Sequence, residues 1–291
     1  MKSLTGRVAV VTGAGSGIGF AMVERFAQEG MKVVVADVVP ERVDAAVEKL
    51  KAQGADALGV PTDVTKYESV EALRDATLEA YGAVHVVCNN AGIGAGAEGR
   101  MWEHEFQDWR WALAVNLWGV IHGINAFVPT LLAQDDEGHV VNTTSGNGGI
   151  TPIPTTPQYA VTKAGVVTLT ECLYAQLHEV SDKVSASVLF PGPHMLRTGL
   201  FESWRTRPDE FAKERPRQTP YVTFADWEEH MKTSGIELDY TPIEEVAANV
   251  VRGVLGDQFW ILPPSDRSDE QIRDRADSML KRENPTYIRP A

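Results

Sequence analysis

Short apolar runs alternate with stretches that have the 3.6-residue period of helices. The seven runs lie at 8–12, 32–37, 57–62, 84–88, 139–143, 184–190 and 259–262. Nearly continuous apolar runs of this length are typical of strands buried on both faces of a parallel sheet. The longest helical patterns lie at 102–132 and 158–180. The alternation predicts an α/β fold, with the whole chain, 1–291, as one domain.

The alternation stops between Thr198 and Tyr240, where the chain becomes charged and aromatic. No core strand is evident there, so segment 194–240 is predicted to be an α-helical or irregular insertion that lies over one end of the sheet as a substrate lid. A helix start follows at Thr241-Pro242. Residues 266–291 are expected to form a C-terminal helix and tail.

Four glycines separate the first strand from the first helix, in the sequence T-G-A-G-S-G-I-G at 12–19. A glycine turn before a helix N-terminus makes an anion site, because backbone N–H groups face the ligand and glycine allows close approach. The alternative is an ordinary tight turn between strand and helix. The residues predicted to contact a dinucleotide here are Gly13, Ser16, Gly17, Ile18 and Gly19.

Asp37 lies at the end of the second strand, 18 positions after Gly19. In dinucleotide-binding folds an acidic residue at this place binds the ribose hydroxyls of the adenosine half. A carboxylate about 4 Å from a 2′-phosphate costs roughly 4 kcal/mol at an effective dielectric near 20. Because segment 38–40 supplies no arginine to offset this repulsion, the predicted cofactor is NAD rather than NADP.

Polar or small residues also follow the third and fourth predicted strands. Asp63 and Val64 are placed to contact the adenine, although a helix-capping or loop role for Asp63 is an equally good interpretation. The turn N-N-A-G at 89–92 suits a chain that bends beneath a ligand, but asparagine-rich turns also occur without one. From this turn, the predicted cofactor contacts are Asn90, Ala91 and Gly92.

The 291-residue chain carries a net charge of −13 and has a pI of about 5.0. This balance argues against nucleic acid or an anionic membrane surface as a partner, so a small molecule is expected. No stretch approaches the roughly 20 apolar residues of a membrane span, and no metal site is expected. Cys88 and Cys172 form no CxxC pair, and we interpret both as buried thiols of a cytoplasmic protein.

Tyr159 and Lys163 lie four positions apart in the second long helical pattern, and Ser145 lies fourteen positions before the tyrosine. Residues with this spacing share one helix face, with Cβ atoms about 5–6 Å apart, so the phenol and the ammonium can occupy one small volume. A neighbouring ammonium favours the phenolate and lowers the pKa of a tyrosine. The pair alone is a weak signal, because a buried tyrosine beside a snorkelling lysine also explains it.

Taken in order, the motifs resemble those of the short-chain dehydrogenase/reductase (SDR) family. They are T-G-x-x-x-G-x-G at 12–19, N-N-A-G at 89–92, Asn116, Ser145, Y-x-x-x-K at 159–163 and Pro191-Gly192. The resemblance covers about residues 2–193 and, more loosely, the last strand. It implies one Rossmann-type domain with a seven-stranded, doubly wound parallel sheet. It also implies an oxidoreductase that acts on CH–OH groups with NAD, and usually a homotetramer or homodimer.

The resemblance further implies a role for each residue of the motifs. Tyr159 would be the general acid/base, and Ser145 would hydrogen-bond the reacting oxygen of the substrate. Lys163 would bind the nicotinamide ribose and lower the pKa of Tyr159. Asn116 would hold a water that links Lys163 to solvent.

The segment after the sixth strand departs from the family pattern. Pro191 and Gly192 would contact the cofactor, but the threonine that often follows four positions after the glycine is displaced, because Thr198 lies six positions beyond Gly192. His194 would contact the substrate, with a structural or solvated role as the alternative. The full set of expected substrate contacts is Ile93, Asn147, Pro193, His194 and Trp204.

The aromatic insertion and the apolar residues Ile93, Ile150 and Ile153 suggest a bulky hydrophobic secondary alcohol or ketone, aromatic or alicyclic, rather than a sugar. A 3-oxoacyl-carrier-protein reductase is an alternative, but it would favour NADPH and a basic docking patch. The residues that could form such a patch, or simply a solvated face, are Arg197, Arg205, Arg207, Lys213, Arg215 and Arg217. A second alternative, a non-catalytic dinucleotide-sensing protein, is opposed by the joint presence of Ser145, Tyr159 and Lys163.

Overall fold

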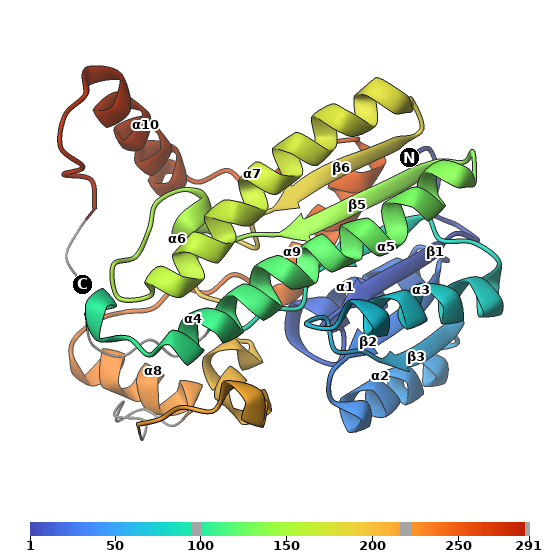
Figure 1. The fold of residues 1–291 in the computed structure, drawn as a ribbon, viewed down its shortest axis with the longest axis horizontal. Helices are drawn as coiled ribbons and strands as arrows, with labels where there is room; N and C mark the ends of the chain where they lie inside the picture. The colour runs from blue at the N-terminus through green and yellow to red at the C-terminus, as the bar shows by residue number, and fades with distance from the viewer. Residues whose placement is uncertain (95–99, 216–222, 289–291) are drawn as a thin grey trace.

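The computed structural model describes residues 1–94, 100–215 and 223–288. Seven parallel strands among these residues form a single sheet in the order β3-β2-β1-β4-β5-β6-β7 (Figure 1). The strands are β1 (Val8–Thr12), β2 (Lys32–Asp37), β3 (Ala57–Pro61), β4 (Val86–Asn89), β5 (Gly138–Thr143), β6 (Val184–Leu189) and β7 (Trp260–Ile261). The predicted α/β fold is confirmed. The strand order reverses between β1 and β4, where ligands bind in sheets of this kind.

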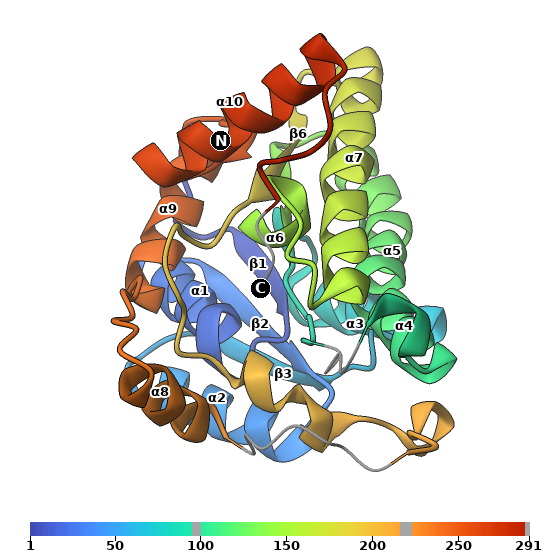
Figure 2. The same cartoon turned by 90° about the vertical axis from the view of Figure 1, so that its left-hand side faces the viewer.

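Helices cover both faces of the sheet (Figures 1 and 2). One face carries α1 (Gly17–Gln28), α2 (Pro40–Ala52) and α9 (Ile243–Leu255), and the other carries α3 (Tyr67–Tyr81), α5 (Gly119–Ala133) and α7 (Pro157–Val180). Successive strand residues point into different cores: Val11 of β1 belongs to the core that contains Phe26, and Val10 to the core that contains Phe127. Burial on both faces explains why the strands are continuous apolar runs.

The helix predicted at 102–132 begins later than expected and is interrupted. A 3₁₀ turn, η1 (Met101–Glu103), precedes α4 (Phe106–Leu113), and a π-helical turn, η2 (Ala114–Trp118), joins α4 to α5. Contrary to the sequence-based expectation, the run Phe106–Ala133 is long and apolar enough to cross a membrane by length and composition. It is a weak indication of a span, because half of its most apolar window is buried inside the fold and core helices meet the same criterion.

The described part of the insertion consists of short helices and contains no strand. They are η3 (Gly199–Thr206), η4 (Asp209–Phe211) and α8 (Phe224–Thr233). The two ends of the insertion meet, because Met195 N donates to Asp239 O (3.0 Å) and Thr241 N donates to Met195 O (2.9 Å). α10 (Asp266–Lys281) follows β7 and projects beyond α7 (Figure 1).

The two cysteines differ in their exposure. Cys88 is buried in β4, whereas Cys172 is exposed on α7. The prediction that both are buried is therefore wrong for Cys172. The buried face of α7 passes through Val166, Thr170 and Leu173, and position 172 lies outside it.

Candidate active site

The glycine loop after β1 forms a cradle that side chains would fill. Gly13 and Gly17 have φ angles of +66° and +55°, which favour glycine. A Cβ added to Gly19 would lie 2.2 Å from Gly13 O. Ser16, at the N-cap of α1, makes no side-chain capping hydrogen bond, so its hydroxyl does not satisfy the first N–H groups of the helix. An open helix N-terminus beside a tight glycine turn fits the pyrophosphate of a dinucleotide.

Asp37 lies at the end of β2, against this loop. Its Oδ2 accepts a hydrogen bond from Gly15 N and its Oδ1 accepts one from Val39 N, both at 3.1 Å. The residue is 8% exposed, so the carboxylate is held at the edge of the glycine cradle, where it fits an adenosine ribose. Arg42, which sequence reasoning missed, also borders the glycine loop, because a Cβ added to Gly15 would lie 2.7 Å from Arg42 Cβ.

The residues after β3 take part mainly in contacts within the protein. Asp63 Oδ1 accepts hydrogen bonds from Thr65 N (3.0 Å) and Thr65 Oγ1 (2.7 Å), which is the loop role considered as its alternative. Val64 is buried, and a Cβ added to Gly119 of α5 would lie 2.9 Å from its Cγ2. The predicted adenine contact therefore rests on the position of this loop at the carboxyl end of β3.

Thr12 organises the turn after β4, and sequence reasoning missed this role. Its Oγ1 accepts hydrogen bonds from Asn90 N (3.0 Å) and Ala91 N (3.1 Å). Asn90 Nδ2 donates to Thr12 O at 3.0 Å. A Cβ on Gly13 would lie 2.9 Å from Ala91 Cα. The ends of β1 and β4 are thus fixed side by side at the switch point, with Asn90 and Ala91 beside the glycine cradle.

Ser145, Tyr159 and Lys163 are brought together beside the end of β5. Ser145 begins the short helical turn α6 (Gly146–Gly149), and its Oγ accepts a hydrogen bond from Asn147 N at 3.2 Å. Lys163 is 3% exposed, and its Nζ donates to Thr143 O at 2.9 Å and lies 5.6 Å from the centroid of the Tyr159 ring. Ser145, Tyr159 and Lys163 therefore lie together in the structure, as their spacing indicated.

The pKa values in this cluster differ from the expectation. Burial raises the pKa of Tyr159 above its ordinary value, against a lowering by its hydrogen bond with Ser145. Burial also lowers the pKa of Lys163 to about 8. Lys163 Nζ bonds to Thr143 O and lies 5.6 Å from the centroid of the Tyr159 ring, and the lowering of the Tyr159 pKa by this ammonium stays a prediction.

Asn116 lies in the π-helical turn and is completely buried. Its Oδ1 accepts a hydrogen bond from Ile93 N (2.8 Å), and its Nδ2 donates to Ile93 O (3.0 Å) and Thr162 Oγ1 (3.3 Å). A Cβ added to Gly92 would lie 3.4 Å from Asn116 Oδ1 and 3.5 Å from Lys163 Nζ. Asn116 and Lys163 therefore both border Gly92, and π-helical turns are frequent at functional sites.

The predicted substrate residues have different surroundings. Asn147 uses its side chain within the loop, since Nδ2 donates to Thr156 Oγ1 and Oδ1 accepts from Ile153 N, both at 2.8 Å. Ile93 packs against Trp111, and Ile150 packs in a core with Phe190, so neither provides an open apolar flank. Ile153 is 46% exposed.

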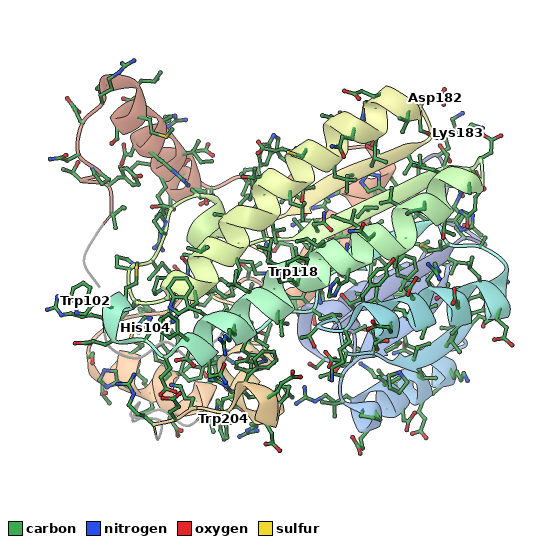
Figure 3. All side chains as sticks on the ribbon, viewed as in Figure 1. Trp102, His104, Trp118, Asp182, Lys183 and Trp204 are labelled. Atoms are coloured by element: carbon green, nitrogen blue, oxygen red, sulfur yellow. The ribbon has the colours of Figure 1, made fainter. Side chains whose placement is uncertain are left out.

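The remaining predicted contacts follow β6. Only glycine fits at position 192 without a shift of its neighbours, because a Cβ there would lie 2.6 Å from Thr241 Oγ1. Pro193 is partly exposed and His194 is exposed, with His194 N 3.4 Å from Thr241 Oγ1. Trp204 is 39% exposed. Trp204 and His104 lie toward the carboxyl ends of the strands, and Lys183 lies at the opposite end (Figure 3).

The arginines and lysine of the insertion pair with acids instead of forming a free basic patch. Arg197 pairs with Glu228 (2.9 Å), Arg205 with Glu202 (2.7 Å) and Arg215 with Glu105 (3.3 Å). Asp108 binds both Arg207 (2.6 Å) and Lys213 (3.6 Å). Arg217 lies outside the described residues.

Two further observations complete the site. Gln158, next to Tyr159, is 1% exposed, and its Nε2 lies 2.7 Å from His104 Nδ1. Sequence reasoning missed this contact, which joins residues 54 positions apart. Within the described residues, no group of three His, Cys, Asp or Glu side chains is placed to hold a metal ion.

Residues 7–209 match the protein family described as short chain dehydrogenase. A short-chain dehydrogenase/reductase from Burkholderia phymatum, solved in complex with NAD, is 37% identical to this chain and superposes with a TM-score of 0.87 over 98% of both chains. Glucose 1-dehydrogenase 2 of Bacillus subtilis is 33% identical over 78% of this chain and 86% of its own. The 1-deoxy-11-beta-hydroxypentalenate dehydrogenase of Streptomyces avermitilis is 38% identical over 63% of this chain and 67% of its own.

Proposed function

The chain belongs to the short-chain dehydrogenase/reductase family, and from this premise we propose that it interconverts a bulky, hydrophobic secondary alcohol and its ketone, with NAD as cofactor. One observation carries this proposal: Ser145, Tyr159 and Lys163 meet beside Gly92, next to the glycine cradle. A phenol, a hydroxyl and an ammonium in one cluster suit proton transfer at a CH–OH group.

Each residue of the set has a distinct task. The chemistry that NAD supplies when bound is hydride acceptance. Tyr159 removes the proton of the substrate hydroxyl, and Ser145 hydrogen-bonds the same oxygen. Lys163 binds the nicotinamide ribose, and Asn116 holds the water that links Lys163 to solvent. General base catalysis of this kind contributes about 10²–10⁴ to the rate.

The remaining cofactor contacts come from the loops at the carboxyl ends of the strands. The residues that would hold NAD are Gly13, Ser16, Gly17, Ile18, Gly19, Asp37, Asp63, Val64, Asn90, Ala91, Gly92, Pro191 and Gly192. The choice of NAD over NADP rests on the Asp37 carboxylate, which the backbone of Gly15 and Val39 holds against the glycine loop.

The substrate class has weaker support. The exposed side chains of Ile153 and Trp204 favour an apolar ligand. The relative from Streptomyces avermitilis is named for a hydroxypentalenate substrate, and the relative from Bacillus subtilis is named for glucose. The ion pairs of the insertion argue against a free docking patch for an acyl carrier protein. A homodimer or homotetramer stays a prediction.

The proposal is tested by following NADH absorbance with NAD or NADP and a panel of aromatic and alicyclic secondary alcohols, with sugar alcohols as the comparison. We expect NADH formation to be fastest with a hydrophobic alcohol and NAD. Faster oxidation of a sugar alcohol would contradict the substrate class. The absence of NADH formation across the panel would favour a dinucleotide sensor.

A further inference from the structure

The first part of the insertion crosses the crevice between β1 and β4. We call residues Thr198–Arg215 the strap. At its start, Thr198 faces the glycine loop, because a Cβ added to Gly17 would lie 3.4 Å from Thr198 Cβ. Five positions later, Ser203 Oγ accepts a hydrogen bond from Gly94 N at 3.0 Å. The strap therefore contacts the loops that follow β1 and β4, on both sides of the switch point at which sheets of this kind bind dinucleotides.

The strap also reaches the loop after β3, on the adenine side of the crevice. Glu210 of η4 pairs with Lys66 at 3.7 Å, and the same lysine pairs with Asp63 at 3.7 Å. Gln107 Nε2 of α4 donates to Glu210 O at 3.2 Å. The strap thus contacts both the phosphate loop and the adenine loop, between which the adenosine half of a dinucleotide would lie.

A buried ion pair fixes the strap to α4. Asp108 has a side chain that is only 3% exposed, and its Oδ1 accepts from Arg207 Nη1 at 2.6 Å. Arg207, 10% exposed, also donates from Nε to Phe211 O at 2.6 Å, and its guanidinium lies 5.0 Å from the centroid of the Trp111 ring. Lys213 approaches Asp108 at 3.6 Å. Removing either partner by substitution would leave the other charge buried without this partner, which would weaken the attachment of the strap to α4.

We propose that the Asp108–Arg207 pair is a latch that holds the strap across the bound dinucleotide, and that opening of this latch sets the rate at which NADH leaves. The inference rests on the proposed function, because it requires the dinucleotide to lie in the crevice. Asp108 and Arg207 are positioning residues, since they act through the strap. Release of the reduced cofactor then limits turnover, as lid opening does in many enzymes.

The test measures NADH dissociation by stopped-flow fluorescence, with excess NAD as the displacing ligand. Arg207→Gln and Asp108→Asn should each speed NADH release at least about tenfold, because each removes one partner of a buried pair. They should raise both kcat and KM for NAD, because release of NADH limits turnover in the wild type. Glu210→Gln, which breaks only an exposed pair, should speed release about twofold. Arg205→Gln is the matched control, because Arg205 pairs with Glu202 inside the strap, and its release rate should equal that of the wild type.

The outcomes separate the latch from the cofactor assignment. Circular dichroism establishes which variants are folded. If Asp108→Asn is unfolded, the NADH release rates of Arg207→Gln and Glu210→Gln test the latch. Wild-type release rates in the folded Arg207→Gln and Glu210→Gln variants would overturn the latch while leaving the proposed function intact. An equal acceleration in Arg205→Gln would also overturn it. A wild-type protein that binds no NADH would overturn the proposed function and the latch together.

Discussion

The Asp37→Asn substitution removes the charge that selects NAD and keeps the size of the side chain. The carboxylate is 8% exposed and accepts one backbone hydrogen bond on each oxygen, from Gly15 N and Val39 N. An amide has only one accepting oxygen, so one of these two N–H groups loses its partner. We expect a loss of about 1–3 kcal/mol in the free energy of unfolding from this change.

The larger effect is on cofactor selectivity. At about 4 Å and an effective dielectric near 20, the repulsion between Asp37 and a 2′-phosphate is roughly 4 kcal/mol, or about a thousandfold in favour of NAD. The amide carries no charge, so Asp37→Asn should raise the ratio of kcat/KM for NADP to that for NAD by at least about a hundredfold. Steady-state kinetics with both cofactors at one saturating alcohol concentration measure this ratio.

Asp63→Asn is the matched control. Asp63 is also an acid at the end of a strand, but its carboxylate is engaged by Thr65. This variant should keep the wild-type ratio. A ratio in Asp37→Asn that is unchanged from wild type would refute the assignment of Asp37 as the selecting residue, and a wild type that prefers NADP would refute it outright.

Two other substitutions test separate parts of the site, and a third perturbation, a change of pH, tests a buried histidine of the core. Gly19→Ala should abolish measurable NADH binding, because its Cβ would lie 2.2 Å from Gly13 O; Gly146→Ala, where no atom lies within 4 Å, should bind normally. Ser145→Ala should move the acidic limb of the kcat–pH profile for alcohol oxidation to higher pH, since it removes the hydrogen bond that lowers the pKa of Tyr159, the general base. Burial lowers the pKa of His139 to about 4. Protonation of this histidine in the unfolded chain should therefore reduce the free energy of unfolding, measured in urea, by about 2 kcal/mol between pH 7 and pH 5. A His139→Gln variant should lack this loss.

The sign of the His139 effect follows from where it titrates. Burial holds its folded-state pKa below the value of about 6.5 in the unfolded chain. The unfolded chain therefore binds the proton first as the pH falls, and stability is lost between about pH 6.5 and pH 4. A variant without this histidine that showed the same loss would place the acid sensitivity elsewhere.

The strands and the common position of Tyr159 and Lys163 could be predicted from the sequence because their signals are local. Strands buried on both faces leave continuous apolar runs, and the helical spacing of Tyr159 and Lys163 fixes their common face. The π-helical turn at Asn116 could not be predicted, because the Asn116 side chain bonds to Ile93 and Thr162 from elsewhere in the chain.

Pairings between distant positions account for most of the remaining differences. Asp108 and Arg207 are 99 positions apart, so the sequence indicated only a basic patch or a solvated face for Arg207 and did not single out Asp108. Thr12 is the first residue of the glycine motif, but its hydrogen bonds with Asn90 and Ala91 form only because β1 and β4 lie side by side. The raised pKa of Tyr159 follows from burial, which could not be predicted from the helical spacing of Tyr159 and Lys163.

The Tyr159→Phe variant tests the central claim most directly, because phenylalanine keeps the ring and removes only the hydroxyl. If Tyr159 is the general acid/base, turnover of the best alcohol in the panel should fall at least about a hundredfold. The dissociation constant of NADH, measured by fluorescence titration, should stay nearly unchanged. A variant that binds NADH normally and retains wild-type turnover would contradict the claim and move the proton transfer to another group.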